Sequence, residues 1–145
     1  MRVVQEFIAI EAPRERVFQL IRDQAERERF LPDGWRFIQS LTDRTDAAGS
    51  QMEIEWQIGP SPLRQVIETL AVSENQIIEA PPMGGNYVTT WTVGEDATAT
   101  LVGLQMRFEY GDILSEFFVK RRLQKSFRQQ LRRLKQTAEA ETLLA

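Results

Sequence analysis

Two glutamates and two tyrosines are the side chains of this sequence best suited to acid–base or hydrogen-bonding chemistry. Glu53 and Glu55 lie two residues apart, so in a β-strand their carboxylates point the same way. Neighbouring carboxylates repel each other's charge, and the pKa of one can rise until it serves as a general acid. Tyr87 and Tyr110 could each donate a hydrogen bond to a carbonyl group of a ligand.

The residues around the glutamates indicate a solvated pair instead. Met52, Ile54 and Trp56 alternate with Glu53 and Glu55. Such alternation is typical of a strand with one face in the core and one face in water. We therefore expect Glu53 and Glu55 to be ordinary surface carboxylates.

The tyrosines fall on apolar strand faces. Tyr110 ends an alternating apolar run that also carries Met106 and Phe108, and Tyr87 shares a strand face with Trp91. A buried tyrosine normally pairs its hydroxyl with a neighbour, so we expect both tyrosines in the core. They are also the two candidates for an ionisable group inside a cavity, if the protein is an enzyme. No other catalytic residue can be assigned from the sequence.

The composition excludes several other chemistries. The 145 residues fit one domain that covers residues 1–145. The chain has no His and no Cys, which rules out a Ser-His-Asp triad, disulfides and thiolate-bound metals. No loop is dense in Asp, so we expect no metal and no cofactor. Residues 1–30 lack a signal-peptide pattern and no apolar run reaches about 18 residues, so we expect a cytoplasmic protein.

Hydrophobic periodicity and turn residues predict seven strands, two short helices and one long helix. The strands are expected at 3–10, 35–43, 51–59, 63–73, 75–80, 86–94 and 98–110. The helices are expected at 13–22, 24–30 and 112–140, the last with Asp112 as its N-cap. Short strands joined by short turns indicate an antiparallel sheet.

The long helix carries one apolar stripe. The stripe residues recur every three or four positions: Leu123, Phe127, Leu131, Leu134 and Ala138. A sheet with one apolar face must cover it, and this helix is the only element long enough to do so. The sequence therefore predicts an α+β fold in which a curved antiparallel seven-stranded sheet wraps around the C-terminal helix, with two short helices after the first strand.

Short motifs along the chain resemble those of a known superfamily. The run from Ile8 to Pro13, followed by Val17 and Phe18, is similar to the opening "I-x-I-x-A-P-x-x-x-V-F" of the START-like (SRPBCC, helix-grip) superfamily. Further matches are Asp23, Gly49, Trp91, the pair Leu134-Lys135, and Glu139. Phe30-Leu31-Pro32 resembles a tripeptide of its coenzyme-Q-binding branch, and other branches are polyketide cyclase/dehydrase-like proteins and plant pathogenesis-related allergens. The resemblance implies a hydrophobic ligand in a cavity between the sheet and the helix.

The favoured hypothesis is that the protein binds an apolar small molecule without catalysis, such as a lipid, an isoprenoid quinone or a polyketide-like aromatic compound. A cyclase or dehydratase acting on a polyketide-like substrate is the alternative that the resemblance implies. The residues expected to line the cavity are Trp56, Tyr87, Trp91, Met106, Phe108, Tyr110, Leu114, Phe117 and Phe118. Pockets for such ligands are mostly apolar, with few polar groups.

Three of these residues lie off the apolar stripe of the long helix: Leu114, Phe117 and Phe118. At about 100° per residue, Leu114 falls about 180° from Leu123. Either the helix breaks near residues 118–119 and its first piece packs on loops, or this turn forms an apolar flap over the mouth of the cavity. We expect ligand access beside these residues and the turn at 81–86.

The long helix is also basic. Residues 112–135 hold eight basic and two acidic side chains, a charge of +6 on a chain whose formal net charge is −3. The basic residues are Lys120, Arg121, Arg122, Lys125, Arg128, Arg132, Arg133 and Lys135. We expect a solvated face that complements an acidic body; the alternative is an interaction module that docks on an anionic membrane surface. Nucleic-acid binding is disfavoured because aromatic residues are not interleaved with the basic residues of the helix. The sequence does not indicate the oligomeric state.

Overall fold

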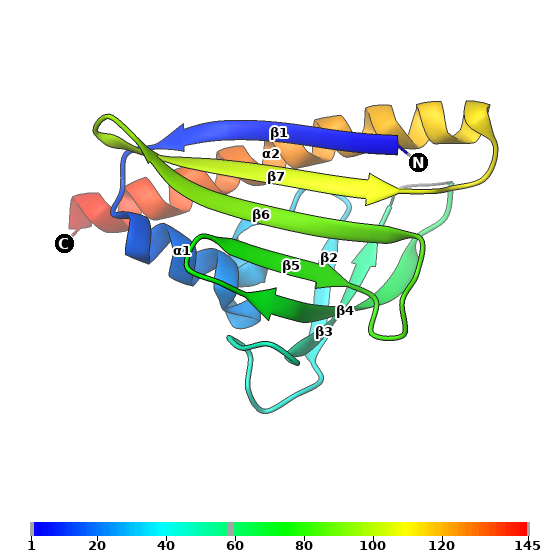
Figure 1. Ribbon diagram of the computed structural model, residues 1–145, viewed down its shortest axis with the longest axis horizontal. Helices are drawn as coiled ribbons and strands as arrows, with labels where there is room; N and C mark the ends of the chain where they lie inside the picture. The colour runs from blue at the N-terminus through cyan, green and yellow to red at the C-terminus, as the bar shows by residue number, and fades with distance from the viewer. Residues whose placement is uncertain (1, 58–59, 145) are drawn as a thin grey trace.

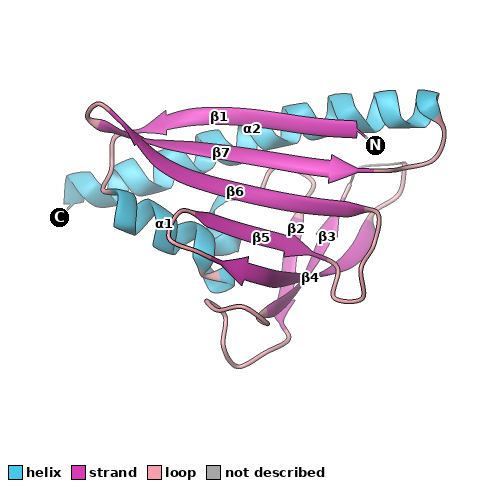
Figure 2. Cartoon of the chain, in the orientation of Figure 1, coloured by secondary structure: helices cyan, strands magenta, loops and turns pink. Residues whose placement is uncertain are grey.

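The computed structural model describes residues 2–57 and 60–144, which form one curved antiparallel sheet around a long helix (Figure 1). In chain order the elements are β1 (Arg2–Ile10), α1 (Arg14–Arg22), the 3-10 helix η1 (Gln24–Phe30), β2 (Arg36–Ser40), β3 (Gln51–Trp56), β4 (Leu63–Val72), β5 (Gln76–Ala80), β6 (Tyr87–Asp96), β7 (Ala99–Phe108) and α2 (Ile113–Leu144). The strand order is β1-β7-β6-β5-β4-β3-β2. Figure 2 shows the helices together on one side of the sheet.

The sheet pairs its first strand in sequence, β1, with its last, β7. β1 pairs with β7 from Arg2 opposite Phe108 to Ile10 opposite Thr100. α2 then packs against β1, α1 and η1. The first strand is therefore held between the last strand and the last helix.

The predicted apolar stripe of α2 is confirmed. Its five members are each at most 1% exposed, among them Phe127 and Leu131. They pack in the concave side of the sheet with buried strand residues such as Val102 and Leu104. Burial of this stripe covers the apolar sheet face, as the sequence predicted.

The end of β7 corrects the sequence analysis, whereas the predicted cap at Asp112 is confirmed. β7 ends at Phe108, so Tyr110 lies in the link to α2 instead of in the strand expected over 98–110. Gly111 takes a φ of 65°, and Asp112 accepts a hydrogen bond from the backbone N–H of Ser115 at 2.8 Å, so the backbone turns here and caps the helix.

The long helix does not break. The two-piece helix with a break near 118–119 is wrong, because α2 is continuous from Ile113 to Leu144. β2 is shorter than the strand expected over 35–43, and residues 58–59 of the strand expected over 51–59 lie outside the described residues.

The basic side of α2 is largely exposed, as expected, and some of its bases also pair with the body of the protein. Arg128 forms an ion pair with Glu6 of β1, and Arg133 pairs with Asp33. Lys135 Nζ donates to the carbonyl oxygen of Ala9 at 3.1 Å. These three bases therefore complement acidic and carbonyl groups of the body, as the sequence analysis expected. Five of the eight bases are exposed: Arg121, Arg122, Lys125, Arg128 and Arg132.

An ion-pair cluster holds the C-terminal part of α2 to the two short helices. The guanidinium of Arg16 donates to both carboxylate oxygens of Glu141, at 2.6 and 2.9 Å, and Arg29 lies 2.7 Å from the same carboxylate. The hydrogen bonds from Arg16, followed by that from Arg29, lower the pKa of Glu141 to about 2.

This cluster predicts a pH-dependent contribution to stability. A carboxylate whose pKa is lower in the folded state stabilises the fold above its unfolded pKa and loses that effect as the pH falls through the folded value. We expect Glu141→Gln to lower the free energy of unfolding by at most about 1 kcal/mol at pH 7, because solvent screens the pair. The difference should vanish between the ordinary glutamate pKa and pH 2 in urea titrations; an unchanged difference at low pH would contradict the assignment.

Candidate ligand-binding cavity

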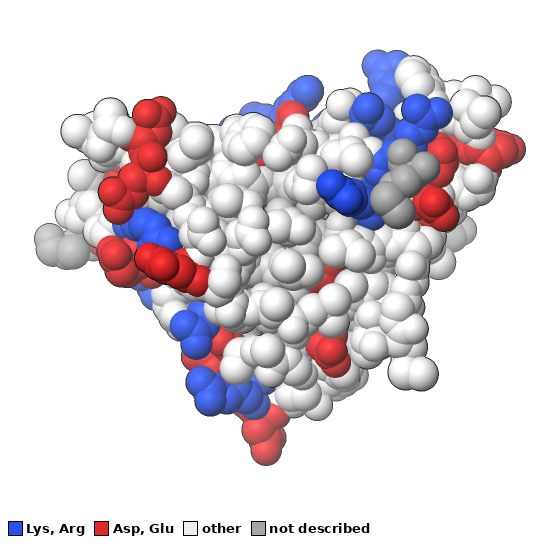
Figure 3. All heavy atoms as spheres, viewed as in Figure 1, with Lys and Arg blue, Asp and Glu red and all other residues white. Residues whose placement is uncertain are grey.

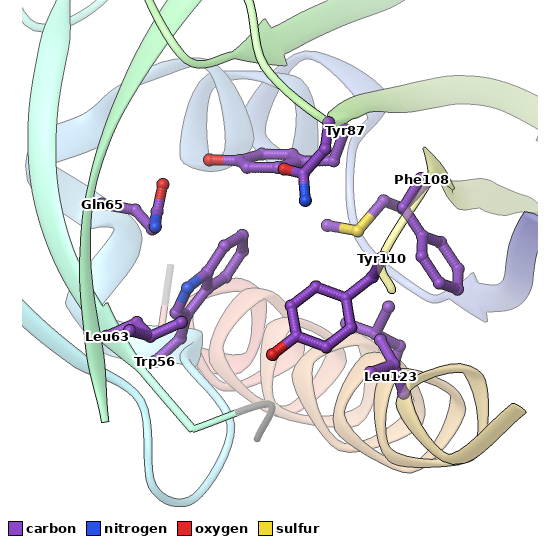
Figure 4. Close-up of a pocket in the computed structure, with 10 residues that line it drawn as sticks. Trp56, Leu63, Gln65, Tyr87, Phe108, Tyr110 and Leu123 are labelled. Atoms are coloured by element: carbon purple, nitrogen blue, oxygen red, sulfur yellow. The ribbon is translucent and has the colours of Figure 1, made fainter. Parts of the chain in front are cut away.

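An apolar cavity of about 90 Å³ lies between the sheet and the first half of α2. Its lining comes from four strands, the loop before β6, the link after β7, and α2: Trp56, Leu63, Gln65, Asn86, Tyr87, Met106, Phe108, Tyr110, Val119 and Leu123. In Figure 4 the rings of Trp56, Tyr87 and Tyr110 surround the cavity. The cavity lies where β3, β4, β6 and β7 face the first half of α2.

The lining has a buried floor and an exposed rim. The floor residues are Trp56, Met106, Phe108 and Leu123, all 5% exposed or less. The rim residues are Leu63, Asn86 and Tyr110. A small apolar molecule could therefore enter from solvent and lose its hydration on an apolar surface.

One buried polar atom in the lining has no partner. The hydroxyl of Tyr87 makes no hydrogen bond, although the residue is only 6% exposed. Its ring packs on Trp56 with the centroids 5.0 Å apart, and in Figure 4 its hydroxyl points toward the side of Gln65. Burial, and next the charge of Glu79, raise the pKa of Tyr87 well above its usual value. The hydroxyl thus stays protonated at neutral pH and is available as a hydrogen-bond donor.

A buried ion pair lies below the cavity floor. Arg27 of η1 donates to both carboxylate oxygens of Glu79 of β5, at 3.1 and 2.8 Å, and both side chains are almost fully buried. The indole N–H of Trp91 donates to the same carboxylate at 3.0 Å. The Arg27 guanidinium also lies 5.3 Å from the centre of the Trp91 ring and donates to the carbonyl of Ile21. The carboxylate is thereby held by three donors.

A smaller void of about 30 Å³ adjoins this ion pair, enough for about one water molecule. Two buried N–H groups near it have no partner, the Nε of Arg27 and the Nε1 of Trp35. Trp56 and Met106 line both the void and the outer cavity, so they form the wall between an apolar chamber and a polar one.

The structure brings together five of the nine predicted lining residues: Trp56, Tyr87, Met106, Phe108 and Tyr110. Trp91 lies deeper, beside the smaller void. Leu114 and Phe117 do not line the cavity, and Phe118 lines a separate hollow on the outer surface. These three point outward because α2 stays straight past residue 118, which keeps them opposite its buried stripe.

The sequence analysis did not identify Arg27 and Glu79. A signal was present for each: Glu79 shares a strand face with Ile77, and Arg27 lies three residues before Phe30 on the short helix. A charged residue on an apolar face indicates a buried pair, but the sequence alone does not say which residues are partners. The cavity residues Leu63, Gln65 and Asn86 were also missed, because they lie at strand ends where the alternation is weakest.

Glu53 and Glu55 lie on the outer face of β3, as predicted. Glu53 accepts a hydrogen bond from Gln39 at 3.1 Å, and Glu55 lies within 3.5 Å of Arg36 and Arg64. Among the described residues, no group of three His, Cys, Asp or Glu side chains is placed to hold a metal ion. Within residues 2–57 and 60–144, neither α-helix is long and apolar enough to cross a membrane.

The chain belongs to the family described as polyketide cyclase/dehydrase and lipid transport, whose sequence pattern matches residues 1–139. The resemblance to START-like proteins noted from the motifs is thereby confirmed. Members of this family bind or transform ligands, which fits a cavity between the sheet and the helix. Among curated proteins, no sequence relative is found.

Solved structures share the fold at low sequence identity. The solution structure of the KanY protein superposes with a TM-score of 0.83 at 21% identity, covering 95% of this chain and 97% of that one. The crystal structure of TTHA0849 from Thermus thermophilus superposes with a TM-score of 0.78 at 20% identity, covering 97% of this chain and 99% of that one. One half of BexL, a di-domain ARO/CYC protein of the BE-7585A biosynthetic pathway, gives 0.73 at 19% identity and covers 96% of this chain and 47% of that one.

Proposed function

We propose that this protein binds an apolar small molecule that carries one hydrogen-bond acceptor, such as a ketone or quinone carbonyl. The observation that carries the proposal is the unpartnered, buried hydroxyl of Tyr87 in a mostly apolar cavity. A buried donor without a partner costs about 1–3 kcal/mol, and a ligand acceptor would remove that cost. The remaining contacts would be apolar, from side chains such as Phe108 and Leu123.

Binding is favoured over acid–base catalysis by the chemistry of the lining. Tyr87 and Tyr110 are the ionisable side chains that line the cavity in the described part of the chain. The raised pKa of Tyr87 keeps its hydroxyl protonated at neutral pH, so no phenolate is available as a base. The carboxylate of Glu79 is already held by Arg27 and Trp91. A cyclase of this family that used the cavity would have to act mainly by holding its substrate in a folded shape.

The proposal predicts a selective effect of Tyr87→Phe. Nile red should bind the wild type saturably, and 2-acetylnaphthalene should displace it better than 2-ethylnaphthalene, which has the same ring but no carbonyl. Removing the hydroxyl should lower the affinity for 2-acetylnaphthalene by roughly fivefold, which corresponds to one net hydrogen bond. The affinity for 2-ethylnaphthalene should stay the same or rise.

A blocking variant locates the binding site. Val119→Trp places a large ring on the α2 side of the cavity and should abolish dye binding. Val88→Trp is the matched control, because Val88 is exposed on β6 and does not line this cavity. If both naphthalenes displaced the dye equally well from the wild type, only the role of Tyr87 would be contradicted. Unchanged dye binding by Val119→Trp would contradict the proposed function itself.

A further inference from the structure

The start of α2 exposes an unusual amount of apolar surface. Four large side chains within its first two turns are between half and three-quarters exposed: Ile113 (75%), Leu114 (66%), Phe117 (51%) and Phe118 (59%). The rings of Phe117 and Phe118 pack edge to face with centroids 5.9 Å apart, so they form one continuous patch. Contiguous exposed apolar patches of this kind mark interaction surfaces.

The same helix face becomes basic immediately after this patch. At about 100° per residue, Leu114, Phe118 and Arg121 share one outward stripe, which continues through Lys125 and Arg132. The Arg121 guanidinium lies 5.9 Å from the centre of the Phe117 ring, so cation and apolar patch are in contact. In Figure 3, Lys and Arg side chains gather over the end of the molecule where α2 begins, with Asp and Glu side chains beside them.

The acidic residues of these turns lie on the other side of the helix. Asp112 is occupied with the backbone N–H of Ser115. Glu116 pairs with Arg2 at 3.4 Å and accepts a hydrogen bond from the backbone N–H of Tyr110. The outward stripe therefore combines exposed apolar side chains with cations and carries no acidic residue of these turns.

We infer that the outward face of α2 docks on the surface of an anionic lipid bilayer. An amphipathic helix binds there when apolar side chains enter the headgroup–acyl boundary and adjacent cations contact anionic headgroups. Phe117, Phe118 and Leu114 supply the first contact, and Arg121 and Lys125 supply the second. The charge complementarity selects an anionic bilayer over an uncharged one.

The position of this surface relates it to the cavity. Tyr110 and Val119 line the cavity and also a hollow of about 570 Å³ on the outside of α2, together with Phe118, Arg121 and Arg122. A protein docked by this face holds the rim of its cavity at the bilayer. The docking inference itself does not depend on what the cavity binds.

Vesicle sedimentation tests the inference. The wild type should sediment with vesicles of an equal mixture of phosphatidylcholine and phosphatidylglycerol, and much less with pure phosphatidylcholine. Arg121→Gln/Lys125→Gln should bind about 25-fold more weakly, because each cation near an anionic leaflet contributes roughly a factor of five. Phe117→Ser/Phe118→Ser should weaken binding by at least about tenfold.

Two matched variants serve as controls and should bind with wild-type affinity. Leu143→Ser/Leu144→Ser removes two exposed apolar side chains from the other end of α2, and Arg36→Gln/Arg44→Gln removes two exposed cations elsewhere. The inference is overturned if the wild type does not bind anionic vesicles, or if the controls lose as much binding as the test variants. It is also overturned if the wild type is a dimer in sedimentation equilibrium and Phe117→Ser/Phe118→Ser makes it a monomer without affecting vesicle binding.

Discussion

Replacing Glu79 with alanine is expected to lower the free energy of unfolding by about 3–5 kcal/mol, a large share of the stability of a domain of this size. The carboxylate accepts three hydrogen bonds, two from Arg27 and one from the indole of Trp91. Its removal leaves the Arg27 guanidinium charged in a site where only 3% of the residue is exposed. Urea titration at neutral pH measures the loss.

A double variant separates the uncompensated charge from simple loss of packing. Arg27→Met/Glu79→Leu replaces both partners with apolar side chains of similar size, and it should cost less than Glu79→Ala alone. If the double variant is instead the less stable of the two, the ion pair itself stabilises the fold and the explanation by an unpaired charge is wrong. If Glu79→Ala changes stability by less than about 1 kcal/mol, the carboxylate is not buried as described.

Phe127→Ala should be the second most damaging change, at about 3–5 kcal/mol. Phe127 is 1% exposed, lies at the centre of the α2 stripe and borders the small void below the cavity. Truncation removes the ring from the contact between helix and sheet and enlarges a void that is already present. Thermal and urea unfolding should both show the loss.

The same helix offers a matched control for this change. Phe118→Ala removes an identical ring from a position that is 59% exposed, so it should alter the free energy of unfolding by no more than about 0.5 kcal/mol. Similar losses for Phe118→Ala and Phe127→Ala would mean that α2 is not oriented with its stripe toward the sheet.

The architecture followed from the sequence because each element carries a strong local pattern. Alternation in β3 placed Met52, Ile54 and Trp56 inward, and the spacing of Phe127 and Leu131 identified the buried side of α2. Coverage of the apolar sheet face then left only one arrangement of helix and sheet. Strand ends were less predictable: alternation continues to Tyr110, but the positive φ of Gly111 and the cap at Asp112 end the strand at Phe108.

The cavity could be predicted only in part. Alternation identified the lining residues on the apolar faces of β3, β6 and β7, because these faces line the cavity. The pairing of Arg27 with Glu79 joins segments far apart in the sequence, and no periodicity identifies such partners. For the outward-facing Phe117 the sequence predicts a helix break or a flap, because it does not show whether a helix continues past an apolar residue on its outer side.

The pairing of β1 with β7 has a consequence for how the chain folds. Arg2 lies opposite Phe108, so the first strand has no neighbour in the sheet until β7, about 100 residues later in the chain, has been synthesised. Contacts between such distant segments slow folding, because a long loop must close before they form. The concave apolar face stays uncovered until α2, which follows all seven strands in the chain, has been synthesised. Nascent chains that end before Ile113 would therefore expose this face and be prone to aggregation.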